Sequence, residues 1–279
     1  MWIERIRAAR HPAASLPRTL DVHYEEAVAQ SRRVRARPGD VIGLALDPRQ
    51  PRRFRAGQIR LARGDVIPLT ICEGRSMPYS SIAGKSWIGS RIPAAGTLRR
   101  VLDVGVGVGR YSSLFREQHP EAEWVGVEIW APYVEQFGLA QKYDRLIIAD
   151  ARWVDLARLG LFDVCFCGDV LEHMSASDAQ ELVDRLLPRC RLLFISIPLG
   201  FCPQGSVFDN PFERHVVEDY SDERIREHFP AVVDGAVETR GAWTIGAYAL
   251  SRDGETIAAL QALRGHDRAE PPGERPGPP

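Results

Sequence analysis

The sequence lacks the features that identify membrane-spanning and disulfide-rich secreted proteins. No apolar run approaches the roughly 20 residues that span a bilayer. The first ten residues alternate charged and apolar side chains and contain no signal-peptide core. The five cysteines are an odd number without metal-type spacing, and Cys165 and Cys167 fall in an apolar run where cysteine acts as a small hydrophobe. These absences predict a cytoplasmic protein with reduced cysteines and no membrane partner.

Lysine is nearly absent, since only Lys85 and Lys142 occur, and arginine carries almost all the positive charge of a chain whose net charge is −1. Between Gln30 and Arg63 there are ten arginines and two aspartates. Such a run can bind phosphates. However, no series of aromatic residues is interleaved for base stacking, and no RNA-binding module is recognisable. We interpret the run as a solvated face and keep a nucleic-acid partner as the alternative.

Glycines interrupt an apolar segment in the stretch VLDVGVGVGR, residues 101–110. The segment predicts a buried parallel strand, and glycines at 105, 107 and 109 predict a tight turn after it. A helix follows over 111–119 and ends at Pro120. A strand, a glycine turn and a helix N-terminus together favour an anionic or nucleotide-type ligand. The dinucleotide pattern G-x-G-x-x-G is excluded, because Arg110 stands where its last glycine is required.

From Arg99 onward, predicted strands and helices alternate, which is typical of a parallel sheet covered on both faces. The predicted strands are Arg100–Val104, Glu123–Glu128, Arg145–Ala149, Val164–Cys167, Leu192–Ile197, Ala231–Arg240 and Trp243–Ser251. The predicted helices cover 111–119, 131–141, 152–159 and 176–187.

The pattern Asp103-x-Gly105-x-Gly107-x-Gly109 resembles motif I of the class I S-adenosylmethionine-dependent methyltransferases. The resemblance covers roughly residues 98–250. It implies an α/β fold with a Rossmann-like seven-stranded sheet, helices on both faces and one antiparallel strand inserted by the last hairpin. It also implies that S-adenosylmethionine is the cofactor. Asp103 would order the turn or hold the cofactor's ammonium through water, and the glycines would let its methionine part approach the backbone.

Further candidate residues follow the next two strands, and ligands of open α/β sheets bind at such carboxyl ends. Glu128 can accept both hydroxyls of a ribose, and Ile129 and Trp130 would pack on adenine. By the resemblance, Asp150, followed by Ala151, would receive the adenine amino group. An alternative role for Asp150 is to cap the following helix, and the two roles can coexist.

The fourth strand ends in a segment whose form, D-x-L-E-H, is common among small-molecule methyltransferases. Asp169 would face the methionine end of the cofactor and the acceptor. Asp169-x-x-Glu172-His173, with the later His215, resembles the E-x-x-E-H…H set that binds a divalent metal in RNA 3′-end methyltransferases. The same residues hold the loop in metal-free relatives, and we predict no metal.

Residues 198–220 form a long loop that resembles the family's acceptor-site segment. His215 is the candidate general base for an acceptor hydroxyl or amine. An equally weighted alternative is that Glu213 and His215 tie the loop to the core. The predicted catalytic residues are His215, His173 and Asp169.

Residues before motif I are assigned by composition. Prolines indicate an irregular arm over 1–20, and a helix over 21–37 and a hairpin over 58–72 are predicted next. Gly84-Lys85-Ser86 is a fragment of a P-loop, but we reject that motif because Tyr79 replaces the required glycine. Tyr79 and Trp87 are candidates for substrate contact.

The predicted organisation has four parts: an N-terminal accessory α+β element at 1–75, a connecting loop at 76–97, a methyltransferase domain at 98–262 and a disordered tail at 263–279. The predicted function is methyl transfer from S-adenosylmethionine to an O, N or C atom of a small molecule, in specialised metabolism. The alternatives are an RNA or nucleotide-linked acceptor and a non-methylating binding protein. The sequence leaves the oligomeric state open, a homodimer included.

Overall fold

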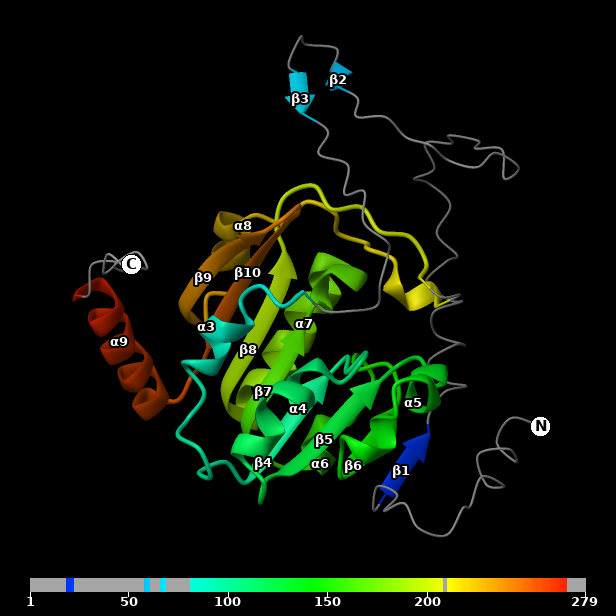
Figure 1. The fold of residues 1–279 in the computed structure, drawn as a ribbon, viewed down its shortest axis with the longest axis vertical. Coiled ribbons are helices and arrows are strands. Elements are labelled where there is room, and N and C mark those ends of the chain that lie inside the picture. The colour runs from blue at the N-terminus through cyan, green and yellow to red at the C-terminus, as the bar shows by residue number, and fades with distance from the viewer. Residues whose placement is uncertain (1–18, 23–57, 61–65, 69–80, 208–209, 270–279) are drawn as a thin grey trace, which may run out of the picture.

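The computed structural model describes residues 19–22, 58–60, 66–68, 81–207 and 210–269, and its centre is an eight-stranded sheet (Figure 1). The strand order is β1 (Thr19–Val22), β6 (Arg145–Ile148), β5 (Glu123–Glu128), β4 (Arg100–Val104), β7 (Phe162–Gly168), β8 (Cys190–Pro198), β10 (Trp243–Leu250) and β9 (Val232–Arg240). Strand β10 is inserted between β8 and β9 and is antiparallel to both, while the other neighbours pair in parallel. The α/β class, the seven predicted strands and the antiparallel insertion are confirmed.

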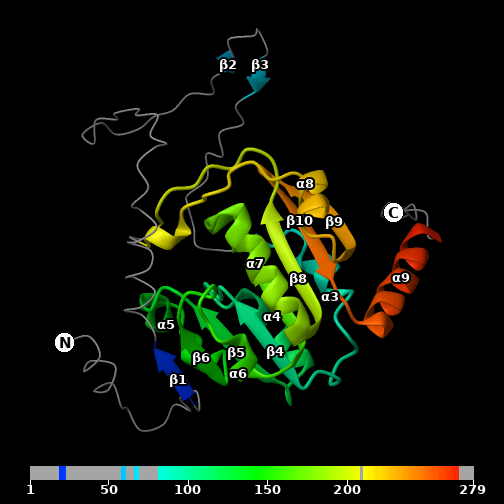
Figure 2. The ribbon, with the colours of Figure 1, turned by 180° about the vertical axis from the view of Figure 1, so that it is seen from behind.

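Helices cover both faces of this sheet, as the alternation of the sequence predicts (Figures 1 and 2). Residues of α6 (Leu156–Leu159), α7 (Ala176–Leu186) and α8 (Asp222–His228) contribute to the core on one face. The opposite face packs against α3 (Lys85–Gly89), α4 (Arg110–Phe115), α5 (Pro132–Gln136) and α9 (Gly254–Ala269). The strand order reverses between β4 and β7, so a ligand is expected at the carboxyl ends of these two strands.

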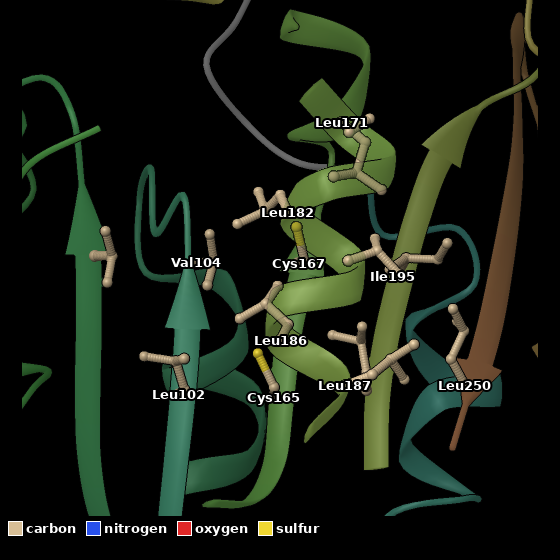
Figure 3. Close-up of a cluster of buried hydrophobic side chains, with 14 of the residues drawn as sticks. Leu102, Val104, Cys165, Cys167, Leu171, Leu182, Leu186, Leu187, Ile195 and Leu250 are labelled. Carbon is tan, nitrogen blue, oxygen red and sulfur yellow. The ribbon is translucent and has the colours of Figure 1, made fainter. Parts of the chain in front are cut away.

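Each face has its own buried core. In Figure 3, Leu182 and Leu186 of α7 lie over Val104, Cys165 and Cys167 of the sheet. Both cysteines are fully buried, which confirms the interpretation of that run as a core strand.

On the opposite face Phe166 stacks with Tyr111 at 4.4 Å between ring centroids and with Phe194 at 5.8 Å. These rings pack the helix that follows the glycine turn against the sheet, so the turn is followed by a close-packed segment.

The structure differs from the sequence-based expectations in the terminal regions. Backbone pairing makes residues 19–22 an edge strand parallel to β6, where an arm ending at 20 and a helix from 21 were predicted. Residues 23–57 lie outside the described part. The predicted hairpin is present as β2 (Gln58–Arg60) and β3 (Val66–Pro68), which pair antiparallel. At the other end, α9 continues to Ala269, through the first residues of the predicted disordered tail.

A short helix, α3, lies inside the segment predicted as a connecting loop at 76–97. Gly84 precedes it with φ of 76°, and a Cβ there would lie 2.8 Å from the Cβ of Ala247. The glycine therefore permits close approach of α3 to β10, which explains the Gly-Lys pair without a phosphate-binding loop. Within the described residues no helix is long and apolar enough to cross a membrane.

Candidate functional site

The glycine turn closes tightly over the end of β4. The backbone N–H of Gly105 donates to the carbonyl of Val127 at 2.8 Å, which ties the turn to β5. Gly105 has φ of 68°, and a Cβ there would lie 2.3 Å from Cγ2 of Val170 in the loop after β7. Only glycine fits this position, and it leaves bare backbone at the edge of the sheet.

Glu128 ends β5 directly beside this turn. One carboxylate oxygen accepts from the N–H of Gly107 at 3.0 Å and the other from the N–H of Trp130 at 2.7 Å. The carboxylate is held in one orientation, and each oxygen keeps a lone pair for a further donor. Burial raises the pKa of Glu128 to about 7, while the two N–H groups oppose that shift.

Asp103 lies beneath the turn and points into the core. It is 1% exposed, and its Oδ2 accepts a hydrogen bond from the hydroxyl of Tyr143 at 2.6 Å. Burial raises its pKa to about 7, although the Tyr143 hydrogen bond lowers it. Asp103 does not line the cavity, and its carboxylate contacts Tyr143 in the core.

Asp150 follows β6 and lines the cavity, but its carboxylate is engaged. Both of its oxygens accept from the guanidinium of Arg152, at 2.6 to 3.1 Å. The expectation that Asp150 also caps the next helix is wrong, because α6 begins six residues later with Asp155 as its cap. A ligand beside Asp150 would therefore contact the Asp150–Arg152 ion pair and not a free carboxylate.

A cavity of about 570 Å³ opens over the carboxyl ends of β4, β5, β6 and β7. Nine of the predicted site residues line it: Gly105, Gly107, Glu128, Ile129, Asp150, Ala151, Asp169, His173 and His215. The predicted residues Asp103 and Gly109 do not. Trp130 packs against Phe212, at 6.1 Å between ring centroids, and does not line the cavity either. Trp87 packs on Phe194, and Tyr79 lies outside the described residues.

Asp169 has an unusual backbone. Its φ of 56° is the sole positive value at a non-glycine position within the described residues. The N–H of Asp169 donates to the carbonyl of Ser196 at 2.8 Å, and its Oδ1 accepts from the Ser196 hydroxyl at 3.2 Å. Backbone held in the left-handed region is common at functional sites. These contacts hold the side chain at the junction of β7 and β8, where it lines the cavity.

Sequence reasoning missed Lys85, which lies behind Asp169. It is 2% exposed, its Nζ donates to the Ser196 hydroxyl at 2.7 Å, and it lies 4.8 Å from the centroid of the Tyr111 ring. Burial alone would lower the pKa of Lys85, but the charge of Asp169 and the Tyr111 hydroxyl outweigh this and raise it. Lysine occurs only twice in the chain, and that rarity was the available signal.

The loop after β8 brings His215 to the end of β7. The N–H groups of Val216 and Val217 donate to the carbonyl of Glu172 at 2.7 and 3.1 Å. The ring of His215 then lies 5.1 Å from the ring of His173. These backbone contacts tie the loop to the turn after β7, the Tyr133 hydroxyl donates to Oε1 of Glu213 at 2.9 Å, and His215 lines the cavity.

Burial lowers the pKa of His173 to about 4, with a further contribution from His215, and burial lowers the pKa of His215 as well. Both rings are therefore neutral at pH 7. Burial and the nearby Asp169 raise the pKa of Glu172 well above its ordinary value. Within the described residues, potential metal-ligand atoms of Glu172, His173 and His215 lie within 4.8 Å of one another.

Residues 102–190 match a family model described as a methyltransferase domain. A search of curated protein sequences found no match.

Several solved structures are similar to this chain. One is the N-terminal domain of EvdMO1 with SAH bound, at 16% identity and a TM-score of 0.46, covering 62% of this chain and 82% of that one. A second is magnesium protoporphyrin IX methyltransferase from Synechocystis PCC 6803 with bound SAM, at 18% identity and a TM-score of 0.44, covering 60% and 76%. A third is an O-methyltransferase family protein from Burkholderia thailandensis, at 14% identity and a TM-score of 0.41, covering 61% and 57%.

Proposed function

We propose that this chain, which carries a class I S-adenosylmethionine-dependent methyltransferase domain, methylates an oxygen, nitrogen or carbon atom of a small molecule in specialised metabolism. The observation that carries the proposal is one continuous cavity. The glycine turn and Glu128 line it together with Asp169, His173 and His215. A volume of about 570 Å³ is in the range of small-molecule sites.

The cofactor end supports binding of an adenosine derivative. Gly105 and Gly107 line the cavity without side chains, so a ligand can approach their backbone. Glu128 would accept the ribose hydroxyls with its remaining lone pairs. Ile129 and Ala151 would provide apolar contact for adenine beside the Asp150–Arg152 pair. When bound, S-adenosylmethionine supplies an electrophilic methyl group on a positively charged sulfur.

The acceptor end has little bond-making chemistry to perform, because the methyl group arrives activated. Its task is to align the acceptor atom in line with the methyl carbon and to exclude water. His173, His215 and Asp169 remain the proposed catalytic residues. A neutral imidazole there can receive the acceptor's proton directly. It can also bind a metal ion that holds the acceptor.

Calorimetry of the full chain with S-adenosylhomocysteine tests the cofactor end, and absence of binding would refute the proposal. Incubation with S-adenosylmethionine and candidate acceptors, with detection of S-adenosylhomocysteine, tests the transfer. Replacing His215→Gln is expected to lower turnover and leave cofactor affinity unchanged. An RNA acceptor read by the arginine-rich segment is the alternative. It would show as salt-sensitive RNA binding, and no binding at low salt would exclude it.

A further inference from the structure

Contrary to the sequence-based prediction of no metal, we propose that Glu172, His173 and His215 bind a divalent first-row transition-metal ion, such as Zn²⁺, at the acceptor end of the cavity. The ion's open coordination positions would hold an oxygen of the acceptor. The site itself is argued from the side chains alone, while its role in methyl transfer rests on the proposed function.

The three side chains converge on a space of the right size. One ligand atom from each lies within 4.8 Å of the others. Zinc–nitrogen and zinc–oxygen bonds are about 2.0–2.2 Å long, so two ligands of one ion are at most about 4.4 Å apart. Ligands of a tetrahedral ion lie about 3.4 Å apart, so side-chain rotations that move the atoms by about 1 Å close the set.

Glu172 provides an independent indication that a cation belongs here. Its side chain is 1% exposed and lines the cavity, and neither carboxylate oxygen has a hydrogen-bond partner among the described residues. Burying an unpaired carboxylate is costly. A proton would remove the charge but leave its O–H without an acceptor. A metal ion neutralises the charge and occupies the oxygen lone pairs together.

A backbone carbonyl oxygen contacts one ring nitrogen of each histidine. Nδ1 of His173 lies 3.2 Å from the carbonyl oxygen of Arg214, and Nδ1 of His215 lies 2.5 Å from that of Cys202. A carbonyl oxygen only accepts, so each Nδ1 carries the proton and each Nε2 has a free lone pair. Metal-binding histidines almost always donate their second ring N–H in this way, because that contact fixes the tautomer and the ring orientation.

The backbone holds the two halves of the set together without the ion. Glu172 and His173 lie in the short turn after β7, and His215 lies in the loop after β8. The N–H groups of Val216 and Val217 donate to the carbonyl of Glu172, and the N–H of His215 donates to the carbonyl of Gln204 at 3.1 Å. The ligands are therefore positioned before binding, which lowers its entropic cost.

Two imidazoles and one carboxylate favour zinc, iron(II) and related ions over magnesium and calcium, which prefer sets of oxygen ligands. Three protein ligands leave open positions toward the cavity. An ion held by these residues would lower the pKa of an acceptor hydroxyl, whose proton would pass to water. The hydroxyl oxygen then forms the bond to the methyl carbon as the carbon–sulfur bond breaks, and S-adenosylhomocysteine leaves as a neutral thioether.

The first test measures metal binding by the full chain, stripped with a chelator and titrated with Zn²⁺ and with Co²⁺, whose visible spectrum reports the ligands. One ion per chain is expected. Glu172→Gln, His173→Gln and His215→Gln should each weaken binding by at least about 100-fold. The matched controls are Glu123→Gln and His228→Gln. Glu123 lies at the start of β5, and the ring of His228 contacts the carbonyl of Ala176 and does not line the cavity. Both controls should bind as the parent does.

The outcomes separate this site from the proposed function. Absence of metal binding, or equal binding by the ligand variants and the controls, overturns the site even when S-adenosylhomocysteine binds normally. Metal binding without S-adenosylhomocysteine binding supports the site and refutes the proposed function. Turnover that is lost on chelation and restored by metal supports the acceptor-binding role. Full turnover by metal-free protein overturns that role. If the Glu172→Gln variant does not fold, the His173→Gln variant is used for the same test.

Discussion

In the core behind the cavity, Nζ of Lys85 lies 3.6 Å from Oδ2 of Asp169, and both atoms belong to side chains that also contact the hydroxyl of Ser196. The lysine precedes the parallel strands β4 to β8, and the aspartate follows β7. Their pairing connects the α3 segment to the end of the sheet at which the cavity opens.

Replacing Lys85→Met is expected to lower the free energy of unfolding by about 3 kcal/mol, because it leaves the carboxylate of Asp169 without its cation in a largely dry environment. Urea unfolding measures the loss. In the double variant with Asp169→Asn, most of that loss should be absent, because the two substitutions act on one interaction. Strictly additive losses would contradict the pairing.

Replacing Gly105→Ala should destabilise the protein by more than about 2 kcal/mol and weaken binding of S-adenosylhomocysteine. The added Cβ meets Cγ2 of Val170 at 2.3 Å in a backbone with φ of 68°. Gly96→Ala is the matched control, because Gly96 has φ of 76° and no atom within 4 Å of the added Cβ. It should cost only about 1–2 kcal/mol, the conformational part of the penalty. Equal losses in thermal unfolding would show that the Val170 contact is unimportant.

Replacing Glu128→Gln is expected to weaken S-adenosylhomocysteine binding by more than about 10-fold, since charged acceptors bind hydroxyls more strongly than neutral ones. The amide's NH₂ would also face a backbone N–H of Gly107 or Trp130. Glu123→Gln, at the opposite end of β5, should bind with parental affinity. Calorimetry provides both values, and equal affinities would exclude Glu128 from the ribose site.

The contribution of Asp103 to the stability of the ligand-free protein should fall as the pH rises from about 5 to about 8. Burial raises the pKa of Asp103 from 3.8 to about 7, so the folded state binds its proton more tightly than the unfolded state does. A carboxyl group with a raised pKa stabilises the fold at low pH, and this contribution disappears as the pH approaches the folded value. The loss is on the order of 2–3 kcal/mol over this range.

Asp103→Asn should flatten that dependence, because the amide keeps an acceptor for the Tyr143 hydroxyl but does not titrate. Glu128 and Glu172, whose pKa values are raised in the same direction, add to the slope that remains, while the lowered pKa values of His173 and His215 oppose it below about pH 6.5. Thermal unfolding of both proteins at half-unit pH steps measures the effect. An unchanged slope in the variant would show that Asp103 does not titrate in this range.

The residues at the strand ends could be predicted from two local patterns, the apolar runs of the strands and the helical segments between them. Apolar runs separated by helical segments indicated a parallel sheet, and the carboxyl ends of parallel strands meet at one edge. Glu128, Asp150 and Asp169 therefore had to lie near one another, whatever the loops did. The same patterns could not show that Arg152 engages Asp150 or that Asp103 points inward, because side-chain partners depend on packing.

The sequence by itself determined the order of strands and helices in the described core, the glycine turn and the acids that follow β5, β6 and β7. The tertiary structure alone decided that Lys85 supports Asp169, that residues 19–22 extend the sheet, and that His215 reaches Glu172 and His173. The physical reason is the range of the interactions. Periodicity records the environment of neighbouring residues, whereas contacts between distant loops depend on how the whole sheet and its helices pack.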